Sequence, residues 1–263
     1  DYTEGKLDEL IDIIIDAKPA IFVCAIGVPP RSVVDRLHAA KIPVMNMIGS
    51  VRHVKKAINA GVDLICAQGT EGGGHTGATA TSVLIPQVVD LCRQAPPSSL
   101  TGKPIEVVAA GGIYDGRGLA MALSLGANAV WVGTRFICAE EASAPKRHQE
   151  GVLTATSEST IRSTIYTGRP LRILNNKYVA EFEEKKRDLI RKAQVTGVIA
   201  GVKDLKEREE RQEKLPILWR RPLLMGQAAG AVKKVQPAKE IMEDMVKEAI
   251  SIIKHNATLV SKL

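Results

Sequence analysis

Short apolar runs alternate along the first half of the chain with longer segments whose apolar positions recur every three or four residues. The short runs are rich in Val, Ile, Leu and Ala, which favour strands, and the longer segments have helical periodicity. Strands are expected at residues 20–25, 43–47, 62–67, 105–110 and 129–132. Helices are expected at residues 31–40, 51–60, 81–93, 116–125 and from about residue 140. Strands that alternate with helices at this spacing predict βαβ units and a parallel sheet.

The regular alternation of expected strands and helices ends at about residue 151. One further strand is expected at residues 161–165, an irregular segment at 215–225, and helices at 177–193, 204–212 and 237–262. We therefore expect a barrel portion at residues 1–151 and a small, mainly helical second domain at 152–263.

Composition sharpens the expected fold. Apolar residues make up 45% of the chain but aromatic residues only 3%, so the core must be aliphatic, as in a parallel sheet buried on both faces. Five βα units are too few to close an eight-stranded barrel, and an open sheet would leave an unpaired edge strand on each side. The expected fold is α/β of the (β/α)8 TIM-barrel type, N-terminally incomplete by about 90 residues at roughly 30 per βα unit.

Charge and cysteine content narrow the classes of partner. The net charge is +7, and much of the excess lies at residues 185–221, where mixed signs are typical of a solvated helical face. With so few aromatic residues a nucleic-acid partner is not expected. The four cysteines are scattered without metal-ligand spacing, which indicates a reducing compartment and no metal site. No signal peptide or membrane-length apolar run is present, so we expect a cytoplasmic protein without a membrane partner.

The strand expected at 62–67 opens into a glycine-rich loop that contains one histidine, His75. Its sequence, Gly72-Gly73-Gly74-His75-Thr76-Gly77, fits the spacing G-x-G-x-x-G. A dinucleotide-binding fold would place an acidic residue at the end of the next strand. That strand instead ends in glycine, so the dinucleotide interpretation is rejected.

Two later strand ends carry the chemistry of a phosphate site. Ala110-Gly111-Gly112 ends one strand and Gly133-Thr134 ends the next, each at the start of a helix or turn. Paired glycines expose backbone N–H groups to an anion, and the ends of two adjacent strands form the phosphate site of many (β/α)8 barrels. The competing interpretation is a tight βα turn, with Asp115 capping the helix.

His75 has two interpretations at this stage. From the residue type alone, a loop histidine hydrogen-bonded to backbone is expected. Its position at the end of a strand, on the side of the phosphate motifs, favours a general base. Glu71 is expected to be a solvated or loop-stabilising carboxylate. The tract 167–172 is expected to form a structural turn, and 226–230 a helix-terminating loop or a second glycine-lined ligand contact.

Together these motifs resemble the nitronate monooxygenases, formerly called 2-nitropropane dioxygenases. The resemblance runs from about residue 20 to the C-terminus and implies an FMN-binding (β/α)8 barrel with a small helical second domain. It also implies a catalytic role for His75. The cofactor-binding residues that it implies are Gln68, Gly69, Gly73, Gly74, Ala110, Gly111, Gly112, Gly133, Thr134 and Gln227.

The resemblance implies oxidative denitrification of alkyl nitronates or nitroalkanes with O2, which yields a carbonyl compound and nitrite. His75 would either remove the α-proton of a neutral nitroalkane or, as a cation, hold the nitronate; these roles need opposite protonation states. One alternative is a flavin-dependent enoyl-thioester reductase of the same barrel type, and another is a non-catalytic flavin- or phosphate-binding paralogue. A homodimer is compatible with the resemblance.

Overall fold

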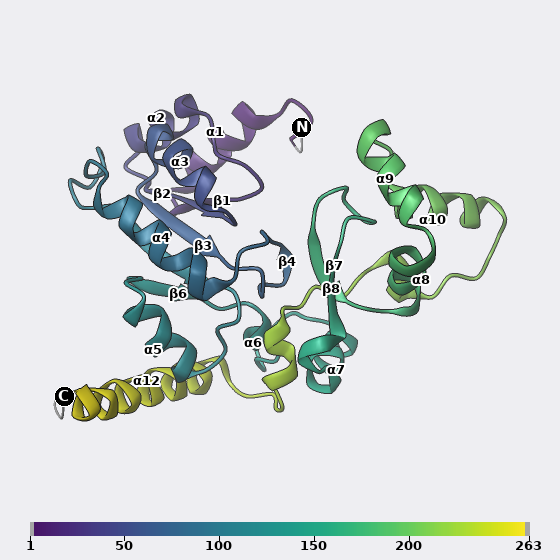
Figure 1. The fold of residues 1–263 in the computed structure, drawn as a ribbon. Coiled ribbons are helices and arrows are strands. Elements are labelled where there is room, and N and C mark those ends of the chain that lie inside the picture. The colour runs from purple at the N-terminus through teal and green to yellow at the C-terminus, as the bar shows by residue number, and fades with distance from the viewer. Residues whose placement is uncertain (1–2, 261–263) are drawn as a thin grey trace. The chain divides into compact units, whose positions relative to one another are not determined.

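The computed structural model describes residues 3–260 and contains two compact units (Figure 1). Unit 1 comprises the chain up to residue 70 together with 77–110 and 120–131. Unit 2 comprises 71–76, 111–119 and the chain from 132 onwards. The expected domain division near residue 151 stays a prediction, because compactness does not test whether a segment folds as an independent domain.

Unit 1 is built on a five-stranded sheet in which all neighbouring strands are parallel (Figure 1). Its strand order is β1-β2-β3-β5-β6, so the sheet expected from the sequence is confirmed. The strands are β1 (Phe22–Cys24), β2 (Val44–Ile48), β3 (Leu64–Gln68), β5 (Glu106–Ala110) and β6 (Ala129–Trp131). Within the described part of the chain this sheet ends at β1 and β6.

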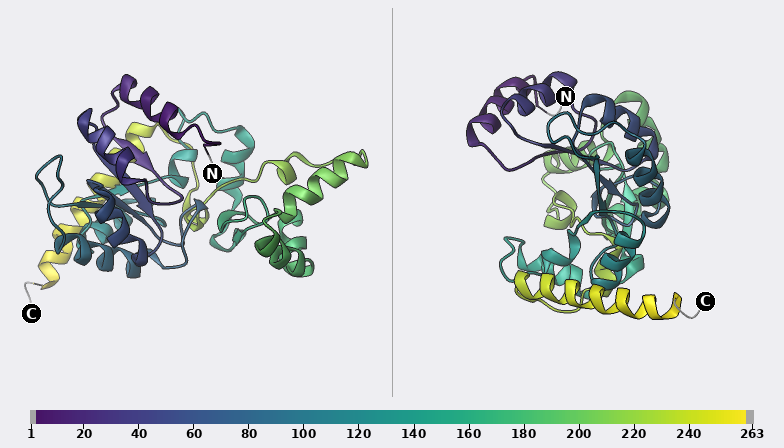
Figure 2. Two further views of the ribbon diagram at one scale, coloured as in Figure 1. Left: turned by 90° about the horizontal axis from the view of Figure 1, so that it is seen from above. Right: turned by 90° about the vertical axis from the view of Figure 1, so that its left-hand side faces the viewer.

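Both faces of the sheet are largely apolar, as is typical of a parallel sheet covered on both sides, and Asn46 is a buried polar residue within it. Met45, Cys66 and Val108 form a buried cluster on one face, and the register pairs Cys66 with Val108. On the other face, Ile65 and Ala109 are completely buried. Helices α2, α3 and α4 lie on one side of the sheet (Figure 2). The helices that involve unit 1 are α1 (Leu7–Ala17), α2 (Arg31–Ala39), α3 (Val54–Ala60), α4 (Thr81–Arg93) and α5 (Gly116–Ser124), with a 3₁₀ turn at Val51–His53 before α3.

A buried carboxylate ties three parts of unit 1 together. Asp63, directly before β3, is 3% exposed and accepts a hydrogen bond from the Val44 N–H at 2.6 Å. Its oxygens also bind the Ser98 hydroxyl and the His38 ring at Nε2. Three hydrogen bonds satisfy a group that would otherwise be costly to bury, and they fix the start of the strand that leads to the glycine loop.

Unit 2 contains a three-stranded antiparallel sheet that the sequence predicts only in part. Its order is β4-β8-β7, with β4 at Gly74–His75, β7 at Thr160–Ser163 and β8 at Leu171–Leu174 (Figure 1). The strand expected at 161–165 corresponds to β7. The sequence predicts a structural turn over the tract 167–172. In the structure the last two residues of this tract belong to β8, and the turn before them reverses the chain so that β8 pairs with β7.

Several helices of unit 2 have other bounds than their sequence pattern indicates. The helix expected at 204–212 runs from Ala200 to Glu210, and the segment 215–225, expected to be irregular, contains a helix at Ile217–Arg220. The helix expected from residue 140 begins at Lys146, directly after Pro145, which is well placed at a helix start. The single helix expected at 177–193 is divided at Lys186. Of the helix expected at 237–262, residues 261 and 262 lie outside the described chain. The helices are α6 (Thr134–Ile137), α7 (Lys146–Thr154), α8 (Lys177–Lys185), α9 (Arg187–Thr196), α10 (Ala200–Glu210), α11 (Ile217–Arg220) and α12 (Ala238–Val260), with 3₁₀ turns at Ser157–Ser159 and Gln227–Ala231.

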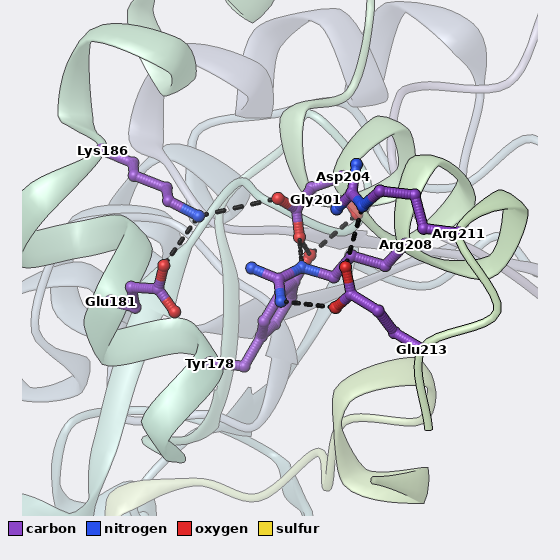
Figure 3. Close-up of polar contacts among 8 residues, drawn as sticks. All are labelled: Tyr178, Glu181, Lys186, Gly201, Asp204, Arg208, Arg211 and Glu213. Atoms are coloured by element: carbon purple, nitrogen blue, oxygen red, sulfur yellow. Dashed lines mark hydrogen bonds and ion pairs between the residues drawn. The ribbon is translucent and has the colours of Figure 1, made fainter. Parts of the chain in front are cut away.

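Much of the mixed charge at residues 185–221 is used inside unit 2, where a polar network joins α8 to α10 (Figure 3). The Tyr178 hydroxyl is hydrogen-bonded to Asp204 Oδ2 at 3.1 Å, and Arg208 Nε donates to the same carboxylate at 2.7 Å. Lys186 lies 3.6 Å from the other Asp204 oxygen. Burial and the Asp204 charge raise the pKa of Tyr178, so its hydroxyl stays protonated. No helix in residues 3–260 is long and apolar enough to cross a membrane.

Candidate functional site

The glycine loop of unit 2 makes close contacts with two segments that are distant in sequence. An added Cβ at Gly73 would lie 2.7 Å from the Gly226 nitrogen, so only glycine fits there without a shift of the backbone. The Gln227 N–H donates to the Glu71 carbonyl oxygen at 3.0 Å. The Gly226 N–H donates to Thr134 Oγ1 at 2.8 Å. The structure therefore brings together three of the motifs that the sequence singles out.

The glycine pair after β5 belongs to the same cluster. Gly111 and Gly112 have φ angles of +96° and +73°, which glycine adopts at little cost. An added Cβ at Gly112 would lie 3.3 Å from the Glu71 Cβ. Within residues 3–260, the backbone N–H groups of Gly112 and Gly133 have no hydrogen-bond acceptor, and an added Cβ at Gly133 would meet open space. The N–H group of Gly133, beside open space, fits a phosphate group.

The remaining predicted cofactor residues lie at strand ends in unit 1. Gln68, the last residue of β3, is the register partner of Ala110, the last residue of β5. The Gly69 N–H donates to the Ala110 carbonyl oxygen at 2.9 Å. These three residues are therefore held at the carboxyl edge of the parallel sheet, where ligands of α/β proteins commonly bind.

His75 is held by the turn between β7 and β8. Its Nε2 lies 3.0 Å from Thr167 Oγ1, and that hydroxyl donates its single proton to the Arg169 carbonyl oxygen at 3.1 Å. A Thr167 hydroxyl that donates to Arg169 accepts from His75, and this arrangement favours the tautomer with the proton on Nε2 and a lone pair on Nδ1. The sequence gives no sign of this contact, because Thr167 lies far from the glycine loop along the chain.

The surroundings of His75 favour the neutral form of its ring. Partial burial, followed by the charge of Arg169, lowers the pKa of the ring below its ordinary value of 6.5. A neutral imidazole with a free Nδ1 can accept a proton but cannot hold an anion as a cation. Of the two protonation states that the sequence leaves open, the lowered pKa favours the neutral one. No group of three or more His, Cys, Asp or Glu in residues 3–260 is arranged to hold a metal ion.

The chain has an α/β fold with a parallel sheet, and solved structures similar to it are TIM-barrel enzymes. FabK from Thermotoga maritima is 27% identical, with a TM-score of 0.74 over 97% of this chain and 76% of that one. The nitroalkane oxidase from Streptomyces ansochromogenes has a TM-score of 0.70 over 94% of this chain and 69% of that one; at 23% identity this likeness concerns the fold alone. A family model for nitronate monooxygenase matches residues 2–248. The chain belongs to the nitronate monooxygenase family.

Relatives in sequence carry more than one kind of name. A Mycobacterium tuberculosis protein provisionally named as a monooxygenase is 36% identical over 93% of this chain and 63% of its own length. A Rhodococcus jostii protein named as a hydroxy-methyl-oxo-octahydro-indene-carboxyl-CoA dehydrogenase is 38% identical over 66% of this chain and 46% of its own. A Staphylococcus saprophyticus protein provisionally named nitronate monooxygenase is 29% identical over 94% of this chain. The chain thus spans less than two thirds of the length of the first two.

Proposed function

We propose that the chain acts in a flavin-dependent oxidoreductase that converts nitroalkanes or alkyl nitronates and O2 into carbonyl compounds and nitrite. The observation that carries this proposal is the placement of His75, whose Nε2 lies 3.0 Å from Thr167 Oγ1 and whose glycine loop packs against Gly226, the residue that also contacts Glu71 and Thr134. Family membership supports the reaction class.

FMN is the proposed cofactor, and unit 2 offers donors suited to its phosphate. Gly112, Gly133 and Thr134 would hold the phosphate through two free backbone N–H groups and a hydroxyl. The other proposed flavin contacts are Gln68, Gly69 and Ala110, which belong to unit 1, and Gly73, Gly74, Gly111 and Gln227, which belong to unit 2. The chemistry that FMN supplies is the transfer of electrons from the substrate to O2.

His75 is proposed to remove the α-proton of a neutral nitroalkane. The proton moves from carbon to Nδ1, and the electron pair of the C–H bond passes into the nitro group, which yields the nitronate anion. The hydrogen bond from Nε2 to Thr167 fixes the orientation of the ring and stabilises the imidazolium that forms.

A flavin titration tests the proposal. Purified protein to which FMN is added is expected to show the visible absorption bands of bound flavin, to lose them when nitronate is added without oxygen, and to release nitrite when oxygen returns. Riboflavin is the matched control, because it lacks only the phosphate and should bind more weakly. Protein that stays colourless after FMN is added would support a non-catalytic role instead.

A second candidate is a flavin-dependent oxidoreductase that acts on a thioester. It is favoured by the 38% identity to a protein named as a CoA-ester dehydrogenase and by the likeness to FabK. Flavin reduction by NAD(P)H in the absence of oxygen and nitronate would distinguish the two, because the nitronate reaction does not require a nicotinamide donor.

A further inference from the structure

One large apolar side chain beside the glycine loop lies outside the core of unit 2. Leu224 is 41% exposed, whereas Leu223 and Met225, on either side of it, are buried in one apolar cluster. The backbone here is held by two hydrogen bonds. His148 Nε2 lies 2.9 Å from the Leu224 carbonyl oxygen, and the Leu174 N–H donates to the Leu223 carbonyl oxygen at 2.9 Å. The packed neighbours of Leu224 therefore fix its side chain in an exposed position.

Leu224 and His75 lie on the same face of the small sheet. His75 is the register partner of Leu171 on β8. Leu224 forms an antiparallel bridge with Ile173, two residues further along the same strand. Alternate residues of a strand project from one face, and directly opposed residues share that face. Because β7 occupies the other edge of β8, Leu224 and His75 lie along one edge, with their partners about 7 Å apart at roughly 3.3 Å per residue.

On this face the two residues of β8 are covered and the two residues at its edge are accessible. Leu171 and Ile173 are buried in an apolar cluster, but His75 is only partly buried and Leu224 is exposed. A Cβ placed on Gly74, the residue before His75, would lie 3.5 Å from Leu224 Cδ2, which is ordinary van der Waals contact. An exposed leucine is common on protein surfaces. This one is held beside the residue proposed to act on the substrate.

We propose that Leu224 contacts the alkyl chain of the substrate and determines which chain length is preferred. The proposal rests on the function proposed for His75 and specifies the substrate class as one with an alkyl chain on the reacting carbon that is long enough to reach Leu224. A nitroalkane chain and the acyl chain of a thioester share this chemistry. Each methylene that leaves water against an apolar side chain strengthens binding by up to about fourfold.

Steady-state kinetics with ethyl nitronate and butyl nitronate test the contact. Leu224→Ala is expected to raise KM for butyl nitronate by about tenfold and to leave KM for ethyl nitronate unchanged, because the shorter chain ends before Leu224. The kcat for either substrate should change by less than about twofold, whereas a disturbed loop would lower kcat for both. Leu224→Met, which conserves the side-chain volume, should restore the low KM for butyl nitronate.

Two controls separate a substrate contact from other roles of Leu224. Leu189→Ala makes the same substitution at a leucine of α9 that is 46% exposed, and it should leave KM for both nitronates unchanged. The FMN affinity and the urea concentration at the midpoint of unfolding should be the same in Leu224→Ala as in wild type. A loss of FMN affinity in this variant would mean that Leu224 covers the flavin, and the substrate contact would then be wrong.

A binding measurement that needs no turnover keeps this proposal separate from the proposed oxidation. Tertiary nitroalkanes have no α-proton, so His75 cannot deprotonate them. In calorimetric titrations of the FMN-loaded protein, wild type is expected to bind 2-methyl-2-nitrohexane about tenfold more tightly than 2-methyl-2-nitropropane. Leu224→Ala should bind both alike.

The outcomes of this titration differ for the two proposals. A chain-length preference that is lost in Leu224→Ala supports the contact even if the protein releases no nitrite, and the proposed oxidation alone would then be refuted. Equal binding of the two compounds by wild type, binding of neither, or a preference that persists in Leu224→Ala would each overturn the role of Leu224.

Discussion

Replacing His75 with asparagine is expected to lower kcat/KM for a neutral nitroalkane by about 10²- to 10⁴-fold, the contribution of a positioned general base. Asparagine can still hydrogen-bond to Thr167 but has no nitrogen that accepts a proton, so the α-proton would remain on carbon. A preformed nitronate has already lost that proton, and its turnover should fall far less. FMN binding should be preserved, because the backbone of the loop is unchanged. Steady-state kinetics with both substrates, together with a flavin titration, measure the three quantities.

Equal losses on nitroalkane and nitronate would refute the base role of His75. Thr167→Val is the matched variant, since it removes the hydroxyl that accepts from Nε2 while leaving the imidazole in place. It should lower nitroalkane turnover by less than His75→Asn does, because the ring remains but is no longer held in one tautomer and orientation.

The pH dependence of kcat/KM tests the protonation state of His75 independently. Burial and the charge of Arg169 lower the pKa of His75 below 6.5, so the neutral base persists as pH falls through 6.5 and is lost only at the lower pKa. The acid limb of kcat/KM for nitroalkane should therefore lie below pH 6.5. Arg169→Gln removes the second cause, and the limb should move to higher pH. A limb above 6.5 in the wild type would contradict the neutral state assigned to His75.

The parallel sheet could be predicted because its determinants are local. Each strand of unit 1 is a short aliphatic run, and all five expected strands appear in one parallel sheet. The motif glycines could also be located, because a strand that ends in glycine is visible in one segment of sequence. Their mutual contacts could not be predicted, since Gly226 meets Gly73 only after two distant segments have folded together.

The small sheet of unit 2 shows why other features of the site escape sequence analysis. β4 has only two residues, Gly74 and His75, and is a strand only because β8 supplies its hydrogen bonds. The bridge between Ile173 and Leu224, which brings Leu224 to the same edge, joins two segments that are distant in sequence. The turn between β7 and β8 likewise acts on His75: Thr167 hydrogen-bonds to the ring, and Arg169 adds to the effect of burial in lowering the pKa of His75.

Gly226→Ala is expected to weaken FMN binding by about 10- to 100-fold, the equivalent of the roughly 1–3 kcal/mol that overpacking costs. The added Cβ would collide with the Glu71 carbonyl oxygen and lie 3.0 Å from the Gly73 nitrogen and 3.2 Å from Thr134 Oγ1. Because these neighbours are backbone atoms and a hydroxyl that accepts from the Gly226 N–H, the loop must move away and the bond to Thr134 must lengthen. Fluorescence quenching of FMN on titration with protein gives the affinity.

Gly197→Ala is the control for the added methyl group, because that glycine of unit 2 has open space around it and lies at the end of α9. Its positive φ of +73° makes alanine strained there, so the variant should lose stability in urea while keeping its FMN affinity. Gly226→Ala should show the opposite pattern, with a larger loss in the free energy of FMN binding than in the free energy of unfolding in urea. If Gly226→Ala binds FMN as tightly as wild type, then the contact among Glu71, Gly73 and Thr134 has no part in the cofactor site, and the three motifs meet for structural reasons alone.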